Sequence, residues 1–135
     1  MEFGLVVHKA LEQMDTGVIA QSALSESDRK RATQMVERGL RSDLLRRAQK
    51  AEQVYRELQF SLMTDAGLME GKIDLLFCEH GKWTLVDYKT DARVEVERYV
   101  EQVRAYESAL KQVAAITLAG KLLFFLGSET IKRVD

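Results

Sequence analysis

The chain has 135 residues, of which 20 are Lys or Arg and 21 are Asp or Glu, so its formal net charge is -1. This balance argues against a strongly basic nucleic-acid module that binds through net charge alone. Hydrophobic residues make up 46% of the chain and charged residues 30%, which is typical of a folded globular domain and argues against disorder. The length fits one compact domain, so we expect residues 1–135 to form a single domain.

The chain carries no sign of a membrane segment or a disulfide framework. No apolar run approaches the roughly 18 residues of a membrane-spanning helix, and the N-terminus lacks the basic and apolar regions of a signal peptide. We therefore expect a cytoplasmic protein without a membrane partner. The single cysteine, Cys78, excludes an internal disulfide, a cysteine-rich zinc site and a four-cysteine iron–sulfur cluster.

The first part of the chain has the apolar spacing of helices. Apolar residues recur at three- and four-residue steps in three segments, 5–14, 25–39 and 42–55. Ser25 (or Ser27) and Ser42 are typical helix N-caps, and Gly39 is a typical residue at a helix C-terminus. We therefore expect a helical part that spans residues 1–56.

After this part the apolar residues alternate, as in strands. Turn residues at 65–67 and 80–81 separate three expected antiparallel strands at roughly 57–64, 69–78 and 83–89. Helical spacing returns at 94–113, and two further strands are expected at 121–126 and 130–134. Helices before and after a mixed sheet with an antiparallel meander indicate an α/β fold, with the sheet flanked by helices.

Two aspartates meet in the hairpin expected around His80-Gly81. A hairpin centred there places residues at equal distances from the turn opposite one another, so Asp74 faces Asp87 at roughly 5 Å between Cβ atoms. Lys89 projects from the same face as Asp87. Directly opposed like charges are destabilising, and Mg²⁺ binds one or two carboxylates together with water and phosphate oxygens. The aspartate pair is therefore a candidate metal site.

A surface ion pair between these aspartates and Lys89 would give the same pattern. The neighbouring residues favour burial, because both faces of the hairpin are apolar. One face carries Ile73, Leu75, Phe77, Val86 and Tyr88, and the other carries Leu76, Cys78, Trp83 and Leu85. The residues alone leave both interpretations open.

Five short motifs follow one another along residues 4–126. They are the histidine-bearing segment 4–12, then Arg56-Glu57-Leu58-Gln59-Phe60, Gly71-Lys72-Ile73-Asp74, Val86-Asp87-Tyr88-Lys89-Thr90 and Gln102-Val103-Arg104-Ala105-Tyr106. This series resembles the helical histidine, E-x-x-F, G-x-x-D, D-x-K-T and Q-x-x-x-Y motifs of the PD-(D/E)xK nucleases. It resembles most narrowly the RecB/AddA-type nuclease domain, which lies at the C-terminus of UvrD/Rep-like helicase–nucleases. Each motif alone is weak, whereas five in this order are specific; the family's proline before Asp74 is missing.

The resemblance implies a restriction-endonuclease-like fold and a metal-dependent site. It implies that Lys89 is the catalytic lysine and that the metal ligands are His8, Asp74, Asp87 and the backbone carbonyl of Tyr88. Mg²⁺ is the expected ion, and an imidazole ligand also suits Mn²⁺. Without the motif order, His8 would fit a surface or core histidine better than a ligand.

Three further residues are expected near the site. Gln102 and Tyr106 are four residues apart and share one face of a helix, and the resemblance implies that they line the DNA side. Tyr106 also fits a core aromatic. Glu57 is expected to support the site or the fold rather than to bind the metal.

The resemblance implies a Mg²⁺-dependent deoxyribonuclease. It would be the nuclease domain of an ATP-dependent helicase–nuclease that acts in double-strand break repair and recombination. Its partners would be single-stranded DNA, the helicase domains of a longer chain and a second subunit. No Walker A motif is present, so no nucleotide is expected to bind here. Two alternatives stay open: a catalytically silent nuclease fold that binds DNA or acts as a scaffold, and a stand-alone restriction or junction-resolving nuclease.

One charged segment stands apart from these motifs. Residues 25–50 carry eight basic and four acidic side chains, a local charge of +4 against -5 for the rest of the chain. A solvated helical face, a surface that contacts DNA phosphates and a docking surface for another domain would each fit this segment.

Overall fold

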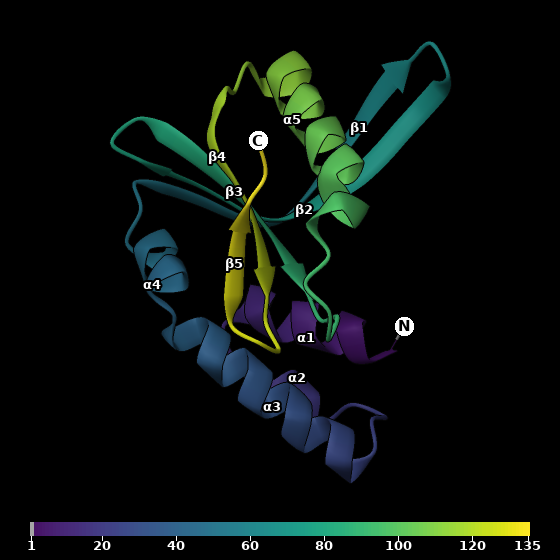
Figure 1. Cartoon of the computed structure of the whole chain (residues 1–135), viewed down its shortest axis with the longest axis vertical. Coiled ribbons are helices and arrows are strands. Elements are labelled where there is room, and N and C mark those ends of the chain that lie inside the picture. The colour runs from purple at the N-terminus through teal and green to yellow at the C-terminus, as the bar shows by residue number, and fades with distance from the viewer. Residues whose placement is uncertain (1) are drawn as a thin grey trace.

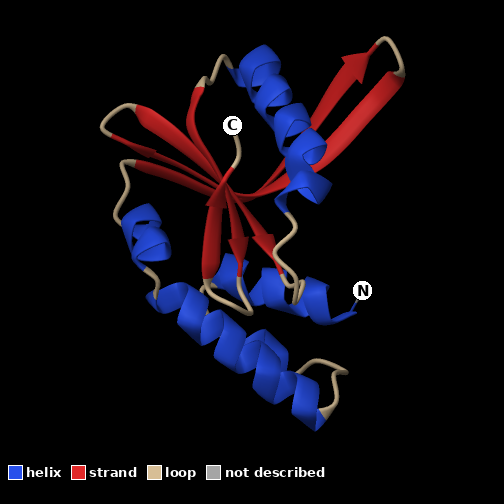
Figure 2. Cartoon of the chain, viewed as in Figure 1, coloured by secondary structure: helices blue, strands red, loops and turns tan. Residues whose placement is uncertain are grey.

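The computed structural model describes residues 2–135, which form a five-stranded sheet with helices on both faces (Figures 1 and 2). The elements in chain order are α1 (Glu2–Gln13), α2 (Gly17–Ala20), α3 (Glu26–Arg41), α4 (Asp43–Gln49), β1 (Gln53–Thr64), β2 (Gly67–Glu79), β3 (Lys82–Lys89), the 3₁₀ turn η1 (Val96–Tyr99), α5 (Val100–Ala114), β4 (Leu118–Phe125) and β5 (Thr130–Arg133). The α/β class and the mixed sheet expected from the sequence are confirmed.

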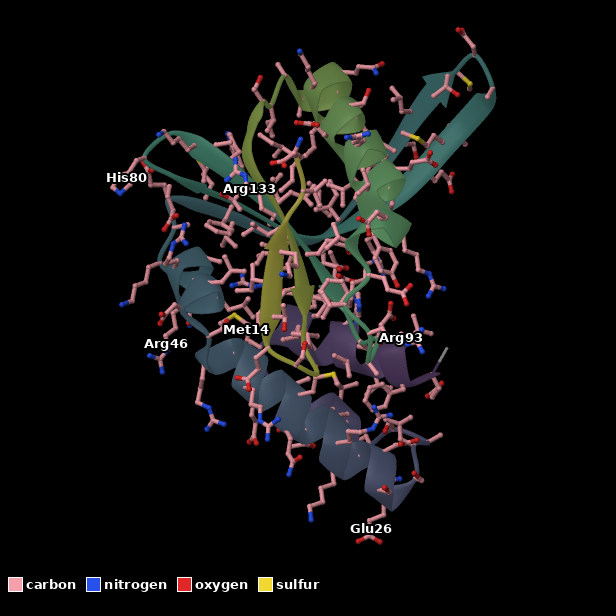
Figure 3. All side chains as sticks on the ribbon, in the orientation of Figure 1. Met14, Glu26, Arg46, His80, Arg93 and Arg133 are labelled. Atoms are coloured by element: carbon pink, nitrogen blue, oxygen red, sulfur yellow. The ribbon has the colours of Figure 1, made fainter. Side chains whose placement is uncertain are left out.

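The strands lie in the sheet in the order in which they occur in the chain. β1, β2 and β3 form the expected antiparallel meander, β4 runs parallel to β3, and β5 returns antiparallel to β4. The helix α5 connects β3 to β4, as a parallel connection requires. The turn between β2 and β3 has two residues of positive φ, His80 and Gly81, which matches a two-residue hairpin; His80 lies at its tip (Figure 3).

Each face of the sheet buries its own hydrophobic core. The four N-terminal helices cover one face, and α5 covers the other (Figure 1). On the first face Val7, Leu11 and Val36 pack against sheet residues such as Phe77, Val86 and Phe124. On the second face Val103 and Leu110 pack against sheet residues such as Leu76, Leu85 and Phe125.

Two predicted helix boundaries are confirmed, and one is wrong. The hydroxyls of Ser25 and Ser42 accept hydrogen bonds from the N–H groups of Asp28 and Leu45, as N-caps do. Gly39 does not end α3, which continues to Arg41. A Cβ at Gly39 would lie 3.2 Å from Cδ2 of Leu126, so this glycine allows close packing of the helix on the sheet.

The expected helical part, residues 1–56, is too long. The helix α4 ends at Gln49, and β1 already begins at Gln53. Val54 pairs with Phe77 and Tyr55 with Leu76, because a β-branched and an aromatic residue suit a strand that has a partner. The helix expected at 94–113 is also modified, since η1 precedes α5.

The faces of β1 and β2 change in the middle of the hairpin. Val54 packs against the N-terminal helices, whereas Leu58 packs against α5, although residues four apart in a regular strand share a face. Glu57 lies between them with a φ of 51°. The pairs Arg56↔Leu75 and Leu58↔Ile73 are formed, but Glu57 and Asp74 do not pair between them. This irregularity turns the hairpin over where two motif carboxylates lie.

Three motif residues pack together beyond this irregularity. The rings of Phe60 and Tyr106 meet edge to face, with centroids 5.6 Å apart. A Cβ at Gly71 would lie 2.5 Å from Cζ of Phe60 and 3.0 Å from Cε1 of Tyr106. Gly71 therefore leaves room for a contact between the β1–β2 hairpin and α5.

None of the helices over residues 2–135 combines the length and the apolar character that a bilayer-spanning helix needs.

Replacing Gly71 with Ala should lower the free energy of unfolding by about 1–3 kcal/mol, because the new methyl group overlaps two aromatic rings that pack on each other. Urea unfolding followed by circular dichroism would measure the change. Gly120→Ala is the matched control, since a Cβ there meets Thr84 at an ordinary 3.5 Å. Equal effects of the two substitutions would contradict the proposed packing role of Gly71.

Candidate active site

Asp74 is buried at the centre of the candidate site. Its side chain is 6% exposed. Oδ2 accepts a hydrogen bond of 2.7 Å from the backbone N–H of Tyr88, and Oδ1 lies 3.0 Å from Nδ1 of His8 on α1. Each of the two carboxylate oxygens therefore has a partner from a different element.

The register of the β2–β3 hairpin was predicted correctly except for the pair Asp74 and Asp87. The pairs from Glu79↔Lys82 to Leu75↔Val86 are as expected. The next expected pair, Asp74 opposite Asp87, is not part of the ladder, which ends at Leu75↔Val86, and the Asp74 carboxylate accepts a hydrogen bond from the Tyr88 N–H. The two aspartates remain close enough for the charge of Asp87 to act on Asp74.

Asp87 is as deeply buried as Asp74. It is 5% exposed, which excludes the interpretation of the two aspartates as solvent-facing residues. Oδ2 lies 3.0 Å from Nζ of Lys89 but outside hydrogen-bonding geometry. Within residues 2–135, this buried oxygen has no hydrogen-bond partner.

Lys89 is held in place from three sides. Its ammonium group lies 3.0 Å from Asp87, donates a hydrogen bond of 3.1 Å to Oε1 of Gln102, and sits 3.9 Å from the centre of the Tyr99 ring. Gln102 in turn donates to the hydroxyl of Tyr106 at 3.1 Å. Gln102 therefore contacts Lys89 directly and Tyr106 contacts it through Gln102; that the two residues line the DNA side stays a prediction. Tyr99 was not among the residues expected at the site, and its contact with Lys89 comes from the fold.

Glu57 reaches the same place from β1. One of its oxygens, Oε1, pairs with Nζ of Lys72 at 3.1 Å. The other, Oε2, is buried and has no hydrogen-bond partner in the described part of the chain. The positive φ of Glu57 is uncommon for a residue with a side chain and accompanies the unpaired position opposite Asp74.

Three potential metal ligands gather here. His8, Glu57 and Asp74 each offer one atom, and these three atoms lie within 4.8 Å of one another. The geometry adds Glu57 to the candidate ligands, although the sequence suggested only a supporting role for it. Its E-x-x-F motif was the available signal, but spacing alone does not show that β1 turns over at this residue.

The buried charges shift one another's pKa values. Burial raises the pKa of Asp74 to about 7, the hydrogen bond from His8 opposes this rise, and the nearby Asp87 adds to it. Burial lowers the pKa of His8, but the hydrogen bond and charge of Asp74, together with the charges of Glu57 and Asp87, outweigh burial, so this pKa lies above its ordinary value. A carboxylate so placed is costly to ionise unless a cation is near.

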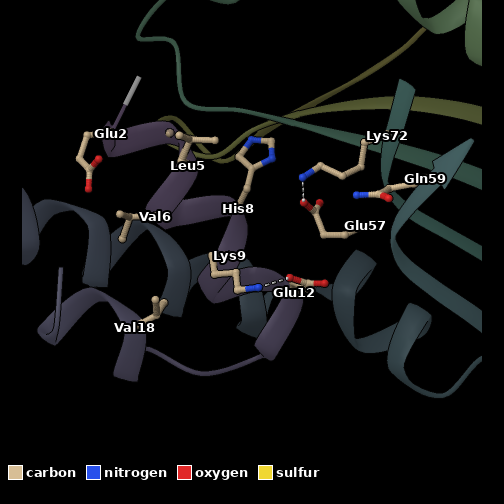
Figure 4. A pocket seen from close by; sticks show the side chains of 11 residues that line it. Glu2, Leu5, Val6, His8, Lys9, Glu12, Val18, Glu57, Gln59 and Lys72 are labelled. Carbon is tan, nitrogen blue, oxygen red and sulfur yellow. Dashed lines mark ion pairs between the residues drawn. The ribbon is translucent and has the colours of Figure 1, made fainter. Parts of the chain in front are cut away.

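A cavity of about 760 Å³ opens beside these residues, between α1 and the β1–β2 hairpin (Figure 4). His8, Glu57 and Lys72 line it, together with Leu5, which is 66% exposed. Figure 4 shows the ion pairs Lys72–Glu57 and Lys9–Glu12 on its wall. Two of the three potential ligands, His8 and Glu57, therefore face this cavity, whereas the buried Asp74 does not line it.

The geometry agrees with comparisons to known proteins. The model of the PD-(D/E)XK nuclease superfamily matches residues 1–134. The chain belongs to this superfamily. It is 27% identical, over 95% of its length, to an ATP-dependent helicase/nuclease subunit of Lysinibacillus sphaericus. It is 30% identical, over 93% of its length, to the protein of the same name from Heliobacterium modesticaldum.

The chain spans only about 12% of the length of these two relatives. A shorter match, 44% identical over 48% of the chain, is to the protein of the same name from Lachnoclostridium phytofermentans and covers 5% of that protein. The likeness therefore concerns one part of much longer proteins.

The stability of this nuclease-superfamily chain should fall as the pH rises from about 5 to about 8 in the presence of a chelator. Asp74 has a pKa of about 7 when folded and an ordinary value of 3.8. The stability that its proton provides is complete below the lower value and is lost as the pH rises through the higher one. The raised pKa of His8 acts in the same direction.

Urea unfolding at the two pH values would measure this loss, expected to exceed about 1 kcal/mol. Asp74→Asn should flatten the dependence, whereas Asp65→Asn, at an exposed turn, should leave it unchanged. Equal stability of the unsubstituted chain at both pH values would contradict the assignment of a buried, protonated Asp74.

Proposed function

We propose that the chain is a metal-dependent deoxyribonuclease domain that hydrolyses phosphodiester bonds. The observation that carries this proposal is the set of buried acidic groups beside a held lysine. The carboxylates of Glu57 and Asp87 pair with Lys72 and Lys89, yet Oε2 of Glu57 and Oδ2 of Asp87 are buried and make no hydrogen bond to the described residues. A buried carboxylate oxygen without a hydrogen bond is normally satisfied by an ordered water or a metal ion.

The residues present fit a divalent cation. His8, Asp74 and Asp87, with the backbone carbonyl of Tyr88, would hold it. Glu57 is a further candidate, because it forms one group of potential ligands with His8 and Asp74, whereas Asp87 lies outside that group. Carboxylate and carbonyl oxygens favour Mg²⁺, and the imidazole of His8 also suits Mn²⁺. When bound, such an ion polarises a phosphate and lowers the pKa of a coordinated water.

The chain's own residues supply the remaining functions. The Lys89 ammonium, held by Gln102 and Tyr99, is available to orient the attacking water and to stabilise negative charge on the phosphate. Its contact with Asp87 keeps it at the edge of the acidic cluster. Asp74 orients the His8 imidazole through the hydrogen bond between Oδ1 and Nδ1.

The wider setting is also part of this proposal. The relatives are named as ATP-dependent helicase/nuclease subunits, which supports a role as the nuclease domain of an ATP-dependent helicase–nuclease in DNA repair and recombination. DNA would reach the site from helicase domains of a longer chain, and a second subunit would be a further partner. A catalytically silent scaffold is disfavoured, because burial of Asp74 and Asp87 is destabilising without a ligand or chemistry that uses them.

Asp87→Ala should abolish cleavage of single-stranded DNA in Mg²⁺ or Mn²⁺, lowering the rate by about 100-fold or more, because it removes a proposed ligand and the partner of Lys89. Gel electrophoresis of labelled oligonucleotides would measure cleavage, and calorimetry would measure Mn²⁺ affinity. The control, Asp65→Ala, removes an exposed carboxylate and should change neither. Cleavage by Asp87→Ala at the unsubstituted rate would refute the site.

Lys89→Met should separate chemistry from metal binding. Cleavage is expected to fall by about 100-fold, because the ammonium group no longer stabilises the reacting charge. Mn²⁺ affinity should be unchanged or higher, since Asp87 loses a competing cation. A parallel loss of metal affinity and cleavage would mean that Lys89 acts only by maintaining the site's structure.

A further inference from the structure

A second hollow, of about 350 Å³, lies where β3 and β4 end. We call it the arginine groove; its polar lining consists of Arg31, Gln34 and Arg38 from α3, Thr90 after β3, and Ser128 after β4. Among the described residues that line it, none is acidic. Neither the metal ligands nor Lys89 belongs to it.

Helix α3 presents its arginines to the groove as one stripe. Arg31, Gln34 and Arg38 are separated by three and four residues, which places them on one face of the helix. The Arg31 guanidinium stacks 4.0 Å from the centre of the buried Phe3 ring, and its only ion pair within residues 2–135 is a 3.5 Å contact with Asp28. The side chain of Arg38 is exposed and makes no hydrogen bond or ion pair with the described residues.

The groove is joined to the candidate active site by the backbone. Thr90 directly follows Lys89, and the Lys89 carbonyl accepts a hydrogen bond of 3.0 Å from the N–H of Leu126 at the end of β4. Gly4 lines the active-site cavity, and a Cβ at Gly4 would lie 3.7 Å from Oγ1 of Thr90. The cavity and the groove therefore adjoin each other at this contact.

We propose that the arginine groove binds the sugar–phosphate backbone of the DNA strand whose neighbouring phosphate occupies the catalytic site. This inference rests on the proposed nuclease function and extends the substrate path to α3. An arginine fork matches two phosphate oxygens, and a groove with arginines and without acidic residues attracts an anion. Crevices at the carboxyl ends of parallel strands are common ligand sites. The contacts are to phosphate, so they carry no base specificity.

The groove also gives the basic segment a role beyond that of a solvated face. The segment 25–50 holds a charge of +4, and two of its arginines converge on a hollow next to the proposed catalytic lysine. The carboxylates of the active site would repel a nucleic acid, and this groove supplies the attraction that offsets them.

The test measures the fluorescence anisotropy of a fluorescein-labelled oligothymidylate of about 12 nucleotides while protein is added. The protein carries Asp87→Ala so that the probe is not cut. The further substitutions Arg31→Ala and Arg38→Ala together should weaken binding by about tenfold, and the slope of log K against log salt concentration should become less steep by about 1.4. The control, Arg46→Ala with Lys50→Ala, removes two positive charges in and just after α4, outside the groove; Arg46 points outward there (Figure 3).

A second variant guards against a folding defect. Arg38→Gln removes only the positive charge of a side chain that makes no hydrogen bond or ion pair with residues 2–135. The fold should therefore be unaffected, and DNA binding should weaken about threefold. In the catalytically competent chain, Arg31→Ala with Arg38→Ala should raise KM for the oligonucleotide and leave kcat unchanged.

The outcomes are distinct. If the groove variants bind DNA with the same affinity or salt dependence as the control variant, the groove is not a DNA-binding surface, and an acidic protein becomes the better candidate for its partner. Absence of cleavage by the unsubstituted chain would contradict the nuclease function instead, while a loss of DNA binding confined to the groove variants would still support the groove.

Discussion

The site depends on the burial of carboxylates inside a sheet that is interrupted to receive them. Asp74 lies where β2 is unpaired on both sides: Glu57 does not pair with it, and the ladder to β3 ends at Leu75↔Val86. The Tyr88 N–H, which loses a strand partner there, is satisfied by the Asp74 side chain. The interruption thus places acidic groups together, and one of them satisfies the Tyr88 N–H.

The motif residues divide into two kinds. His8, Glu57, Asp74, Asp87 and Lys89 bring ionisable groups together, whereas Phe60, Gly71 and Tyr106 hold the turned-over half of the hairpin against α5. Gln102 connects the two kinds, since it bonds both Lys89 and Tyr106. Gln102 therefore links the packing of the hairpin on α5 to the placement of Lys89.

Charge is separated across the molecule rather than absent from it. The near-zero total combines an acidic cluster in the sheet with a basic stripe on α3, and these meet where Thr90 follows Lys89. Such a division suits a polyanionic substrate whose reacting phosphate needs a cation and whose flanking phosphates need arginines. The net charge of the whole chain is therefore a poor guide to nucleic-acid binding, because it averages the acidic cluster and the basic stripe.

Local patterns were enough to predict the α/β class, the antiparallel meander, the His80-Gly81 register and the motif series, because apolar periodicity and turn residues act over short stretches of chain. They did not reveal that β1 begins at Gln53. The apolar spacing of residues 42–55 is helical throughout, and only pairing with β2 shows that the last of these residues form a strand. Three features became visible only in the folded chain: Asp74 leaves the ladder, Glu57 joins His8 and Asp74, and Tyr99 lies beside Lys89. The contacts of Asp74 and Glu57 join residues far apart in the chain and accompany the reversal of faces at Glu57, which no local pattern encodes.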